Sequence, residues 1–220
     1  RWRRHHASLF KETSCTYTSV RELIADLWRQ RHAGLAELLR DMIFVGAVDA
    51  TFAAVQHGTK LLVLNHAEMA RELFYQLAVR RFGCAARLRL APGQRPSVRE
   101  CLRAAVGAHR ARLPAGADPE EAAAQAEELL LGHGEMLDEY FRLSFDEEGR
   151  VACLPELLDG HAPQPEALPL FLLRLATEVD FEREQACFEG VAAELALWYA
   201  RLPVEDVEGE DAGGGGGGGG

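Results

Sequence analysis

Three short apolar segments separated by tight turns place the strongest constraint on how this chain folds. They cover residues 43–48, 51–56 and 60–64, and a turn at 57–59 joins the last two. Segments of this length are typical of strands, and a short connection containing glycine is typical of a β-hairpin. The sequence therefore predicts an antiparallel, three-stranded meander.

Helical patterns lie on both sides of this meander. Ser19 and Glu22 have the spacing of a capping box, which predicts that a helix begins there, and Gly34 is expected to bend or interrupt it. A second amphipathic pattern over about 67–82 predicts a helix that covers one face of the sheet.

The middle of the chain has a pattern of its own. Residues 85–90 predict a strand, about 98–112 a helix, Asp118 the cap of a helix that runs to Phe141, and 142–154 a hairpin. This mixture of helices and antiparallel strands indicates an α+β domain, with the middle part inserted as a second lobe.

A proline-rich crossover leads into the last part of the chain. The nearly continuous apolar run at 170–175 predicts a buried strand, and the pattern from Phe181 to Leu202 predicts a final amphipathic helix. Residues 1–17 predict the end of a linker. We expect 203–220 to be a disordered tail, because its acidic and all-glycine segments bury too little apolar area to offset their ordering entropy.

Charge limits the function classes. The chain has 24 Lys and Arg against 34 Asp and Glu, a formal net charge of −10, which disfavours a general phosphate-binding surface. A homodimeric DNA-binding module with weak contacts stays open, because the middle lobe carries several arginines. These are Arg87, Arg89, Arg103, Arg110 and Arg112. No apolar run reaches the roughly 18 residues that span a bilayer. Five widely spaced cysteines without a CxxC pair indicate reduced, intracellular thiols.

The junction between the third strand and the next helix is the most enzyme-like part of the sequence. His66, Glu68 and Glu72 are candidate ligands for a divalent metal ion in a nuclease. The simpler interpretation is that Asn65 caps the helix and that its polar neighbours are exposed.

The last helix brings two further candidate groups. Glu178, Asp180 and Glu184 lie near its start, where they either complement the helix dipole or form an acidic patch for a basic peptide. Trp198 and Tyr199 lie near its end, and large aromatic rings are typical both of a core and of an interface centre.

Five sequence blocks, in one order along the chain, carry a resemblance to a known family. They are FVG at 44–46, QHGTKL at 56–61, ELFYQ at 72–76, DEEG at 146–149 and LRLATEV at 173–179. Over about 18–200 the chain resembles the C-terminal domain of the MutL homologue one family of eukaryotic DNA mismatch-repair proteins. The resemblance implies a function in DNA mismatch repair and a location in the nucleus.

The resemblance also implies a two-lobed dimerisation domain. Residues 18–84 and 168–202 correspond to an internal lobe, an antiparallel sheet with covering helices that pairs with a PMS-type MutL subunit. About 85–167 correspond to an inserted, smaller and mainly helical external lobe. We expect the interface on the strands at 43–64 and on the last helix. The candidate interface residues are Phe52, Gln56, Leu62, Leu64, Trp198 and Tyr199.

The same resemblance assigns the chemistry to other regions. In this family the ATPase lies in an N-terminal region, and the endonuclease belongs to the PMS-type partner, whose metal motif begins with Asp. This chain has Asn65 in the aligned place and Arg71 where a later Glu stands. We therefore expect no catalytic residue, metal ion or cofactor in it. The alternative is a metal-dependent endonuclease subunit in its own right.

Docking of other repair proteins is a further implication. Glu184 matches a position near the family's docking site for partners such as the mismatch-repair exonuclease, so Glu178, Asp180 and Glu184 are candidate peptide-docking residues. MutS-type complexes are further expected partners, DNA is contacted only weakly or indirectly, and no membrane is involved. Chains of this family continue past the point where this sequence stops, and they end in a Cys that reaches towards the partner's metal site. The acidic, all-glycine end therefore means either a truncated fragment or a lost contribution.

Overall fold

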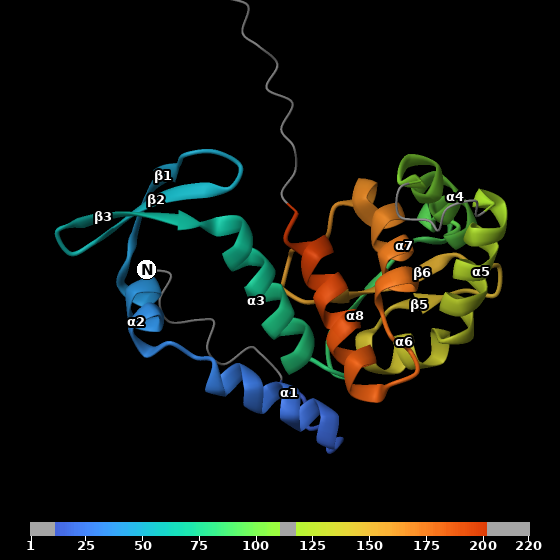
Figure 1. The fold of residues 1–220 in the computed structure, drawn as a ribbon, viewed down its shortest axis with the longest axis horizontal. Helices are drawn as coiled ribbons and strands as arrows, with labels where there is room; N and C mark the ends of the chain where they lie inside the picture. Colours follow the sequence, from blue (N-terminus) through green and yellow to red (C-terminus); the bar gives the residue numbers. More distant parts are fainter. Residues whose placement is uncertain (1–11, 111–117, 202–220) are drawn as a thin grey trace, which may run out of the picture.

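The computed structural model describes residues 12–110 and 118–201, and the fold is reported for these residues. The chain has a small sheet at one end and a larger, mostly helical body at the other (Figure 1). Two helices open the chain, α1 at Thr18–Arg29 and α2 at Ala33–Asp41, so the expected interruption falls just before Gly34. The predicted capping box is wrong, because Tyr17 is the cap residue of α1 and the Ser19 hydroxyl donates to Glu184 instead.

The predicted meander is confirmed. It consists of β1 at Ile43–Ala47, β2 at Phe52–His57 and β3 at Lys60–Asn65, paired antiparallel in this order. Gly58 has a φ of +60°, and this left-handed conformation favours glycine in the two-residue turn between β2 and β3. The predicted covering helix is α3 at His66–Arg80.

The middle of the chain forms a second antiparallel sheet with helices around it. Its strands are β4 at Ala86–Arg89, β5 at Ser144–Phe145 and β6 at Val151–Glu156, in the order β4-β6-β5. Its helices are the short η1 at Pro92–Gln94, α4 at Val98–Ala108, α5 at Pro119–Gly132, α6 at Gly134–Phe141 and the short η3 at Pro165–Ala167.

The single helix predicted from Asp118 to Phe141 is two helices in the structure. Asp118 accepts a hydrogen bond from the backbone N–H of Glu120, so the predicted start is confirmed. The chain leaves helical geometry at His133, between two glycines, which are the weakest helix formers after proline.

The buried strand predicted at 170–175 is wrong, because these residues belong to α7 at Leu168–Glu178. Neighbouring elements bury α7 on several sides, and five of its eleven residues are buried. A helix covered in this way produces the same continuous apolar run as a buried strand, so periodicity alone could not separate them. The predicted last helix is confirmed as α8 at Glu184–Tyr199, but it is not amphipathic, because nine of its sixteen residues are buried.

One hydrophobic core joins most of these elements. Helix α7 packs on α4, α5 and α8, and α8 packs in turn on α3 and α1. Within the described residues this core contains no side chain of β1, β2 or β3. The α+β class with antiparallel sheets is therefore confirmed, whereas the lobe boundaries stay a prediction. None of the described helices has the length and apolar character to cross a membrane.

Candidate functional site

One face of the β1–β2–β3 sheet consists of exposed, mostly apolar side chains. The register pairs Ile43 with Gln56 and Gln56 with Leu61, which places these three on the same face, and Phe52 and Val63 share it by strand alternation. The exposed fractions are 63% for Ile43, 40% for Phe52, 69% for Leu61 and 65% for Val63. We call Ile43, Phe52, Gln56, Leu61 and Val63 the open face.

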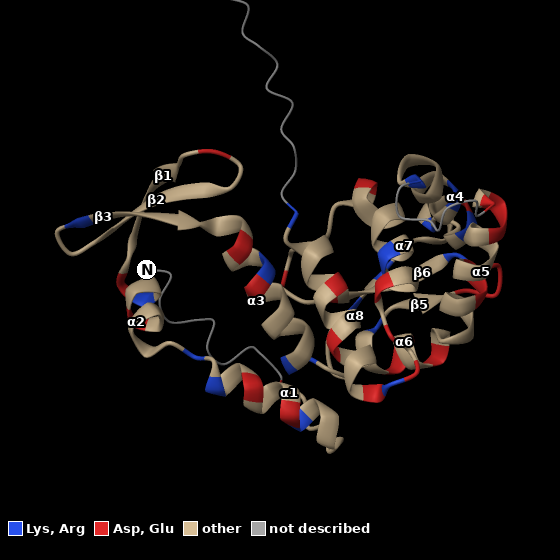
Figure 2. Ribbon diagram, viewed as in Figure 1, with Lys and Arg blue, Asp and Glu red and all other residues tan. Residues whose placement is uncertain are grey.

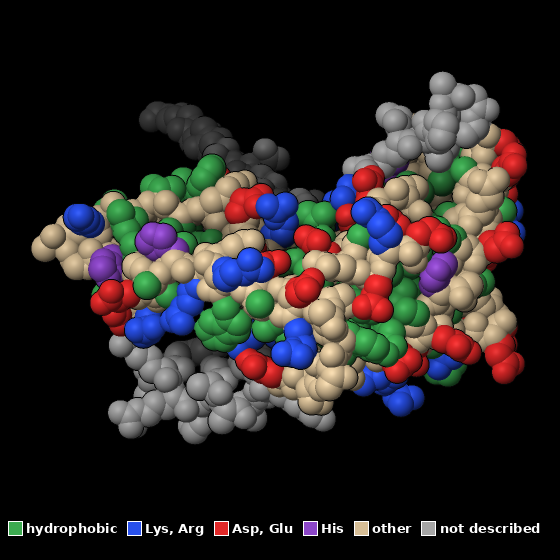
Figure 3. Space-filling view, turned by 60° about the horizontal axis from the view of Figure 1, so that its bottom comes forward, with side chains coloured by type: hydrophobic (Ala, Val, Ile, Leu, Met, Phe, Trp, Pro, Cys, Tyr) green, Lys and Arg blue, Asp and Glu red, His purple; other side chains and the backbone are tan. Residues whose placement is uncertain are grey.

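The three strands that form the open face carry almost no charge. Lys60, at the hairpin, is the one charged residue of the three strands, and Figure 2 shows the sheet nearly free of charged residues. In the space-filling view hydrophobic side chains show along the upper rim of this end, with histidine and charged side chains below them (Figure 3). Clustered apolar side chains in contact with water commonly mark an interaction site.

Two of the predicted interface residues on the sheet lie on the open face and two do not. The structure places Phe52 and Gln56 there, whereas Leu62 and Leu64 are half-buried on the opposite face, in register with β2 residues such as the buried Val55. The residues of β3 that are exposed on the open face are Leu61 and Val63 instead. Counting outward from the two-residue turn at 58–59 would have given this register.

Trp198 and Tyr199 belong to the core, which corrects their assignment to the interface. They are 3% and 0% exposed. The Trp198 ring stacks on Phe171 with centroids 4.4 Å apart, and the Tyr199 hydroxyl donates to the carbonyl oxygen of Pro155. Burial raises the pKa of Tyr199. Neither side chain is available to a partner.

The predicted acidic patch has partners within the chain. The Ser19 hydroxyl donates to Glu184 Oε1 at 2.5 Å and thereby joins α1 to the start of α8. Arg183 Nε donates to Asp180 Oδ2 at 2.6 Å, and this bond lowers the pKa of Asp180. Glu178 is exposed at the end of α7. All three carboxylates remain near the surface and interact within the chain, Glu178 through the charge of Arg174.

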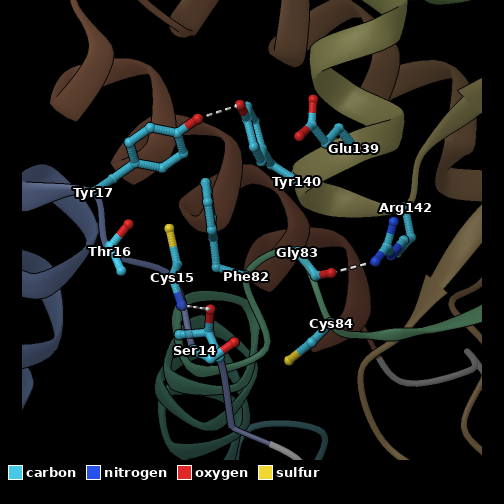
Figure 4. Close-up of a pocket in the computed structure, with 11 residues that line it drawn as sticks. Ser14, Cys15, Thr16, Tyr17, Phe82, Gly83, Cys84, Glu139, Tyr140 and Arg142 are labelled. Atoms are coloured by element: carbon cyan, nitrogen blue, oxygen red, sulfur yellow. Dashed lines mark hydrogen bonds between the residues drawn. The ribbon is translucent and has the colours of Figure 1, made fainter.

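A cavity of about 430 Å³ lies between residues 13–17 and the ends of α3 and α6 (Figure 4). The hydroxyls of Tyr17 and Tyr140 form a hydrogen bond of 2.9 Å, and this bond is the main cause that raises the pKa of Tyr140 to about 12. The Phe82 ring stacks on Tyr140 with centroids 4.9 Å apart. Arg142 donates to the carbonyl oxygen of Gly83 at the rim.

The acidic patch adjoins this cavity. Phe188 lies one turn after Glu184 on α8, and its ring contacts Tyr17 and Tyr140 at centroid distances of 6.4 and 5.5 Å. Glu139 also lines the cavity. Aromatic rings with carboxylates beside them suit a ligand that carries both an aromatic and a basic group.

Each of the three candidate metal ligands contacts a different neighbour within the chain, so they do not converge on one point. His66 Nε2 lies 3.2 Å from a backbone carbonyl, Glu68 pairs with Arg71 at 2.5 Å, and Glu72 accepts a hydrogen bond from Gln76 at 2.7 Å. In the described part of the chain, no group of three or more His, Cys, Asp or Glu side chains is placed to hold a metal ion. The geometry favours the simpler interpretation, since Asn65 caps α3 by accepting from the Glu68 N–H.

Several arginines of the middle lobe form ion pairs with acidic neighbours. Arg87 pairs with Asp138, and Arg103 pairs with Glu120 at 2.7 Å. Figure 2 shows Lys and Arg interspersed with Asp and Glu over this lobe. Arg112 lies outside the described residues. This arrangement gives no continuous basic surface for a nucleic acid among the residues shown.

Comparison with known proteins identifies the family. The family model described as DNA mismatch repair protein Mlh1 C-terminus matches residues 16–213. The chain is 34% identical over 187 residues to DNA mismatch repair protein Mlh1 of Dictyostelium discoideum, covering 84% of this chain and 21% of that protein. It is 29% identical over 208 residues to DNA mismatch repair protein MLH1 of Saccharomyces cerevisiae. That match covers 89% of this chain and 26% of the yeast protein. The chain thus spans about a fifth to a quarter of the curated relatives it matches, and it belongs to the Mlh1 C-terminal domain family.

Proposed function

We propose that this chain is a non-catalytic dimerisation domain for DNA mismatch repair, which pairs with a PMS-type MutL subunit through the open face. The observation that carries the proposal is the exposure of Ile43, Leu61 and Val63 on one uncharged face. Covering a side chain of this kind gains about 1.5–3 kcal/mol, so contact with a matching apolar face is favourable.

Analytical ultracentrifugation with a PMS-type C-terminal domain tests this pairing. We expect the unsubstituted chain to sediment as a one-to-one complex, and Val63→Lys to sediment as separate monomers. Leu131→Lys is the matched control, because Leu131 is exposed on α5, outside the sheet. A chain that stays monomeric beside this partner would contradict the proposal.

We further propose that incision chemistry belongs to the partner and that this chain needs no cofactor, with ATP bound in the family's N-terminal region. The protein would act in the nucleus, where chromosomal mismatches arise. The alternative is an endonuclease that uses His66, Glu68 and Glu72. Manganese-dependent nicking of supercoiled DNA by this chain alone, abolished by Glu68→Ala, would establish that alternative.

A second proposed function is docking of repair partners, such as the mismatch-repair exonuclease and MutS-type complexes, with DNA contacted weakly or indirectly. Glu184 beside the aromatic cavity supports it, because the two together suit a peptide with basic and aromatic residues. Fluorescence anisotropy with such a peptide should show weaker binding to Glu184→Lys than to Glu182→Lys. Equal affinities would count against this docking site.

A further inference from the structure

The open face is too small to form a stable interface alone. Three strands about 4.8 Å apart and six residues long, at about 3.4 Å per residue, cover roughly 300 Å². A specific, stable interface buries about 800 Å² on each partner. A subunit that pairs through the open face must therefore also cover surface beyond it.

Apolar surface continues around the β1 edge of the sheet. Phe44 follows Ile43 and points to the opposite face, because it pairs with Val55, which pairs with Leu62. On that opposite face Val55 is 1% exposed, whereas Phe44 is 66% exposed. The opposite face is thus covered at its centre and bare at the β1 edge.

Helix α2 lies next to this bare edge and is only partly covered, with Leu38 and Leu39 half-buried. It is separated from β1 by Met42 alone, and Figure 1 shows it beside the sheet. Leu35, Leu38 and Leu39 recur at helical spacing, yet no side chain of α2 is buried and Leu35 is 48% exposed. A nine-residue helix is marginal in water unless its apolar stripe is packed against something.

We propose that the PMS-type partner clasps the β1 edge, covering the open face on one side and Phe44 with the apolar stripe of α2 on the other. This inference rests on the proposed dimerisation. The consecutive residues Ile43 and Phe44 present apolar side chains to opposite faces of one edge strand, so one partner that wraps the edge buries both. The same clasp protects the free β1 edge from pairing with unrelated strands.

Hydrogen exchange on the unsubstituted chain tests the clasp first. Adding a PMS-type C-terminal domain should slow exchange at the backbone amides of α2 as well as at those of β1–β3. This measurement needs no variant, so it does not depend on whether a substituted chain folds. Slowed exchange in the sheet with unchanged exchange in α2 overturns the clasp and leaves the dimerisation standing.

Binding constants from titration calorimetry provide the second test. We expect Leu35→Lys and Phe44→Lys each to weaken partner binding at least tenfold, with Leu131→Lys unchanged as control. If Val63→Lys abolishes binding while both of these variants bind normally, the clasp is wrong and the dimerisation holds. If Leu35→Lys and Phe44→Lys bind normally but Leu73→Lys, on the exposed side of α3, weakens binding, the interface extends over α3 and the clasp is wrong. Normal binding by Val63→Lys would refute the dimerisation itself.

Discussion

Arg174 and Glu194 form a doubly hydrogen-bonded ion pair that joins α7 to α8. Arg174 Nε lies 2.6 Å from Glu194 Oε2, and Arg174 Nη2 lies 2.7 Å from Oε1. The Glu194 side chain is 6% exposed and that of Arg174 is 22% exposed. The hydrogen bond to Glu194 is the main cause that raises the pKa of Arg174 above its ordinary value, so the guanidinium stays charged.

The two halves of this ion pair should not be equivalent on substitution. Arg174→Ala leaves the buried Glu194 carboxylate without its counter-charge and should lower the free energy of unfolding by about 3 kcal/mol. Glu194→Ala should cost less, because the remaining guanidinium is partly exposed and can reach water. Urea unfolding followed by circular dichroism measures both values. Equal losses would contradict the role assigned to burial.

Tyr199→Phe should destabilise the chain without changing partner binding. It removes the hydrogen bond to the Pro155 carbonyl, which contributes about 1 kcal/mol, and it leaves the open face untouched. Urea unfolding and titration calorimetry check the two halves of this prediction. If Tyr199→Phe still folds but binds the partner more weakly, Tyr199 contributes to the interface and this prediction is wrong.

The contribution of Tyr199 should also fade at high pH. Burial raises the pKa of its phenol above the ordinary value of 10.0. A raised folded-state pKa gives stability that is complete below pH 10.0 and lost as the pH rises through the folded value. The difference in unfolding free energy between the unsubstituted chain and Tyr199→Phe should therefore shrink above pH 10. A constant difference up to pH 11 would disagree with this account.

Ser19→Ala should loosen the joint between α1 and α8. The serine hydroxyl donates to the Glu184 carboxylate, and losing that bond should cost about 1 kcal/mol in urea unfolding. The freed carboxylate should bind a basic peptide more tightly in anisotropy measurements. Thr18→Ala serves as control, since Thr18 is exposed beside it. Unchanged stability in Ser19→Ala would show that the bond is not structural.

Asp49→Asn should change the acid sensitivity of the loop before β2. The Asp49 carboxylate accepts hydrogen bonds from the backbone N–H groups of Thr51 and Phe52, both at 2.7 Å, and these bonds lower its pKa below 3.8. Its stabilisation is complete above pH 3.8 and is lost as the pH falls through the lowered folded value. The free energies of unfolding of the unsubstituted chain and of Asp49→Asn should therefore converge below the folded-state pKa of Asp49. Parallel curves down to pH 2 would contradict it.

The sheet could be predicted from the sequence because its determinants are local. Gly58 and the short apolar runs on either side of it specify the hairpin without reference to the rest of the chain. Leu62 and Leu64 lie on the face opposite to Gln56, because a shift of one residue exchanges the faces of a strand. Reading the register outward from the turn would have selected Leu61 and Val63.

Other features depend on partners far along the chain, so no local pattern could give them. The hydroxyl of Ser19 finds Glu184, which lies 165 positions away, and the predicted capping box could not compete with it. The apolar run of α7 is continuous because α4, α5 and α8 surround it, which is a property of the packed molecule. Trp198 and Tyr199 have the same spacing whether they meet a core or a partner, and only the burial separates these cases.

Among the described residues the main core stops short of β1, β2 and β3, and this has a consequence for the supply of the two subunits of the proposed dimer. In that dimer, a copy without its partner would keep its folded helical body. It would expose an apolar sheet with unpaired strand edges to chaperones and to other unpaired copies. Production of this chain in excess of its partner should therefore yield soluble but aggregation-prone protein. Matched synthesis of the two subunits is the simplest way for a cell to avoid that loss.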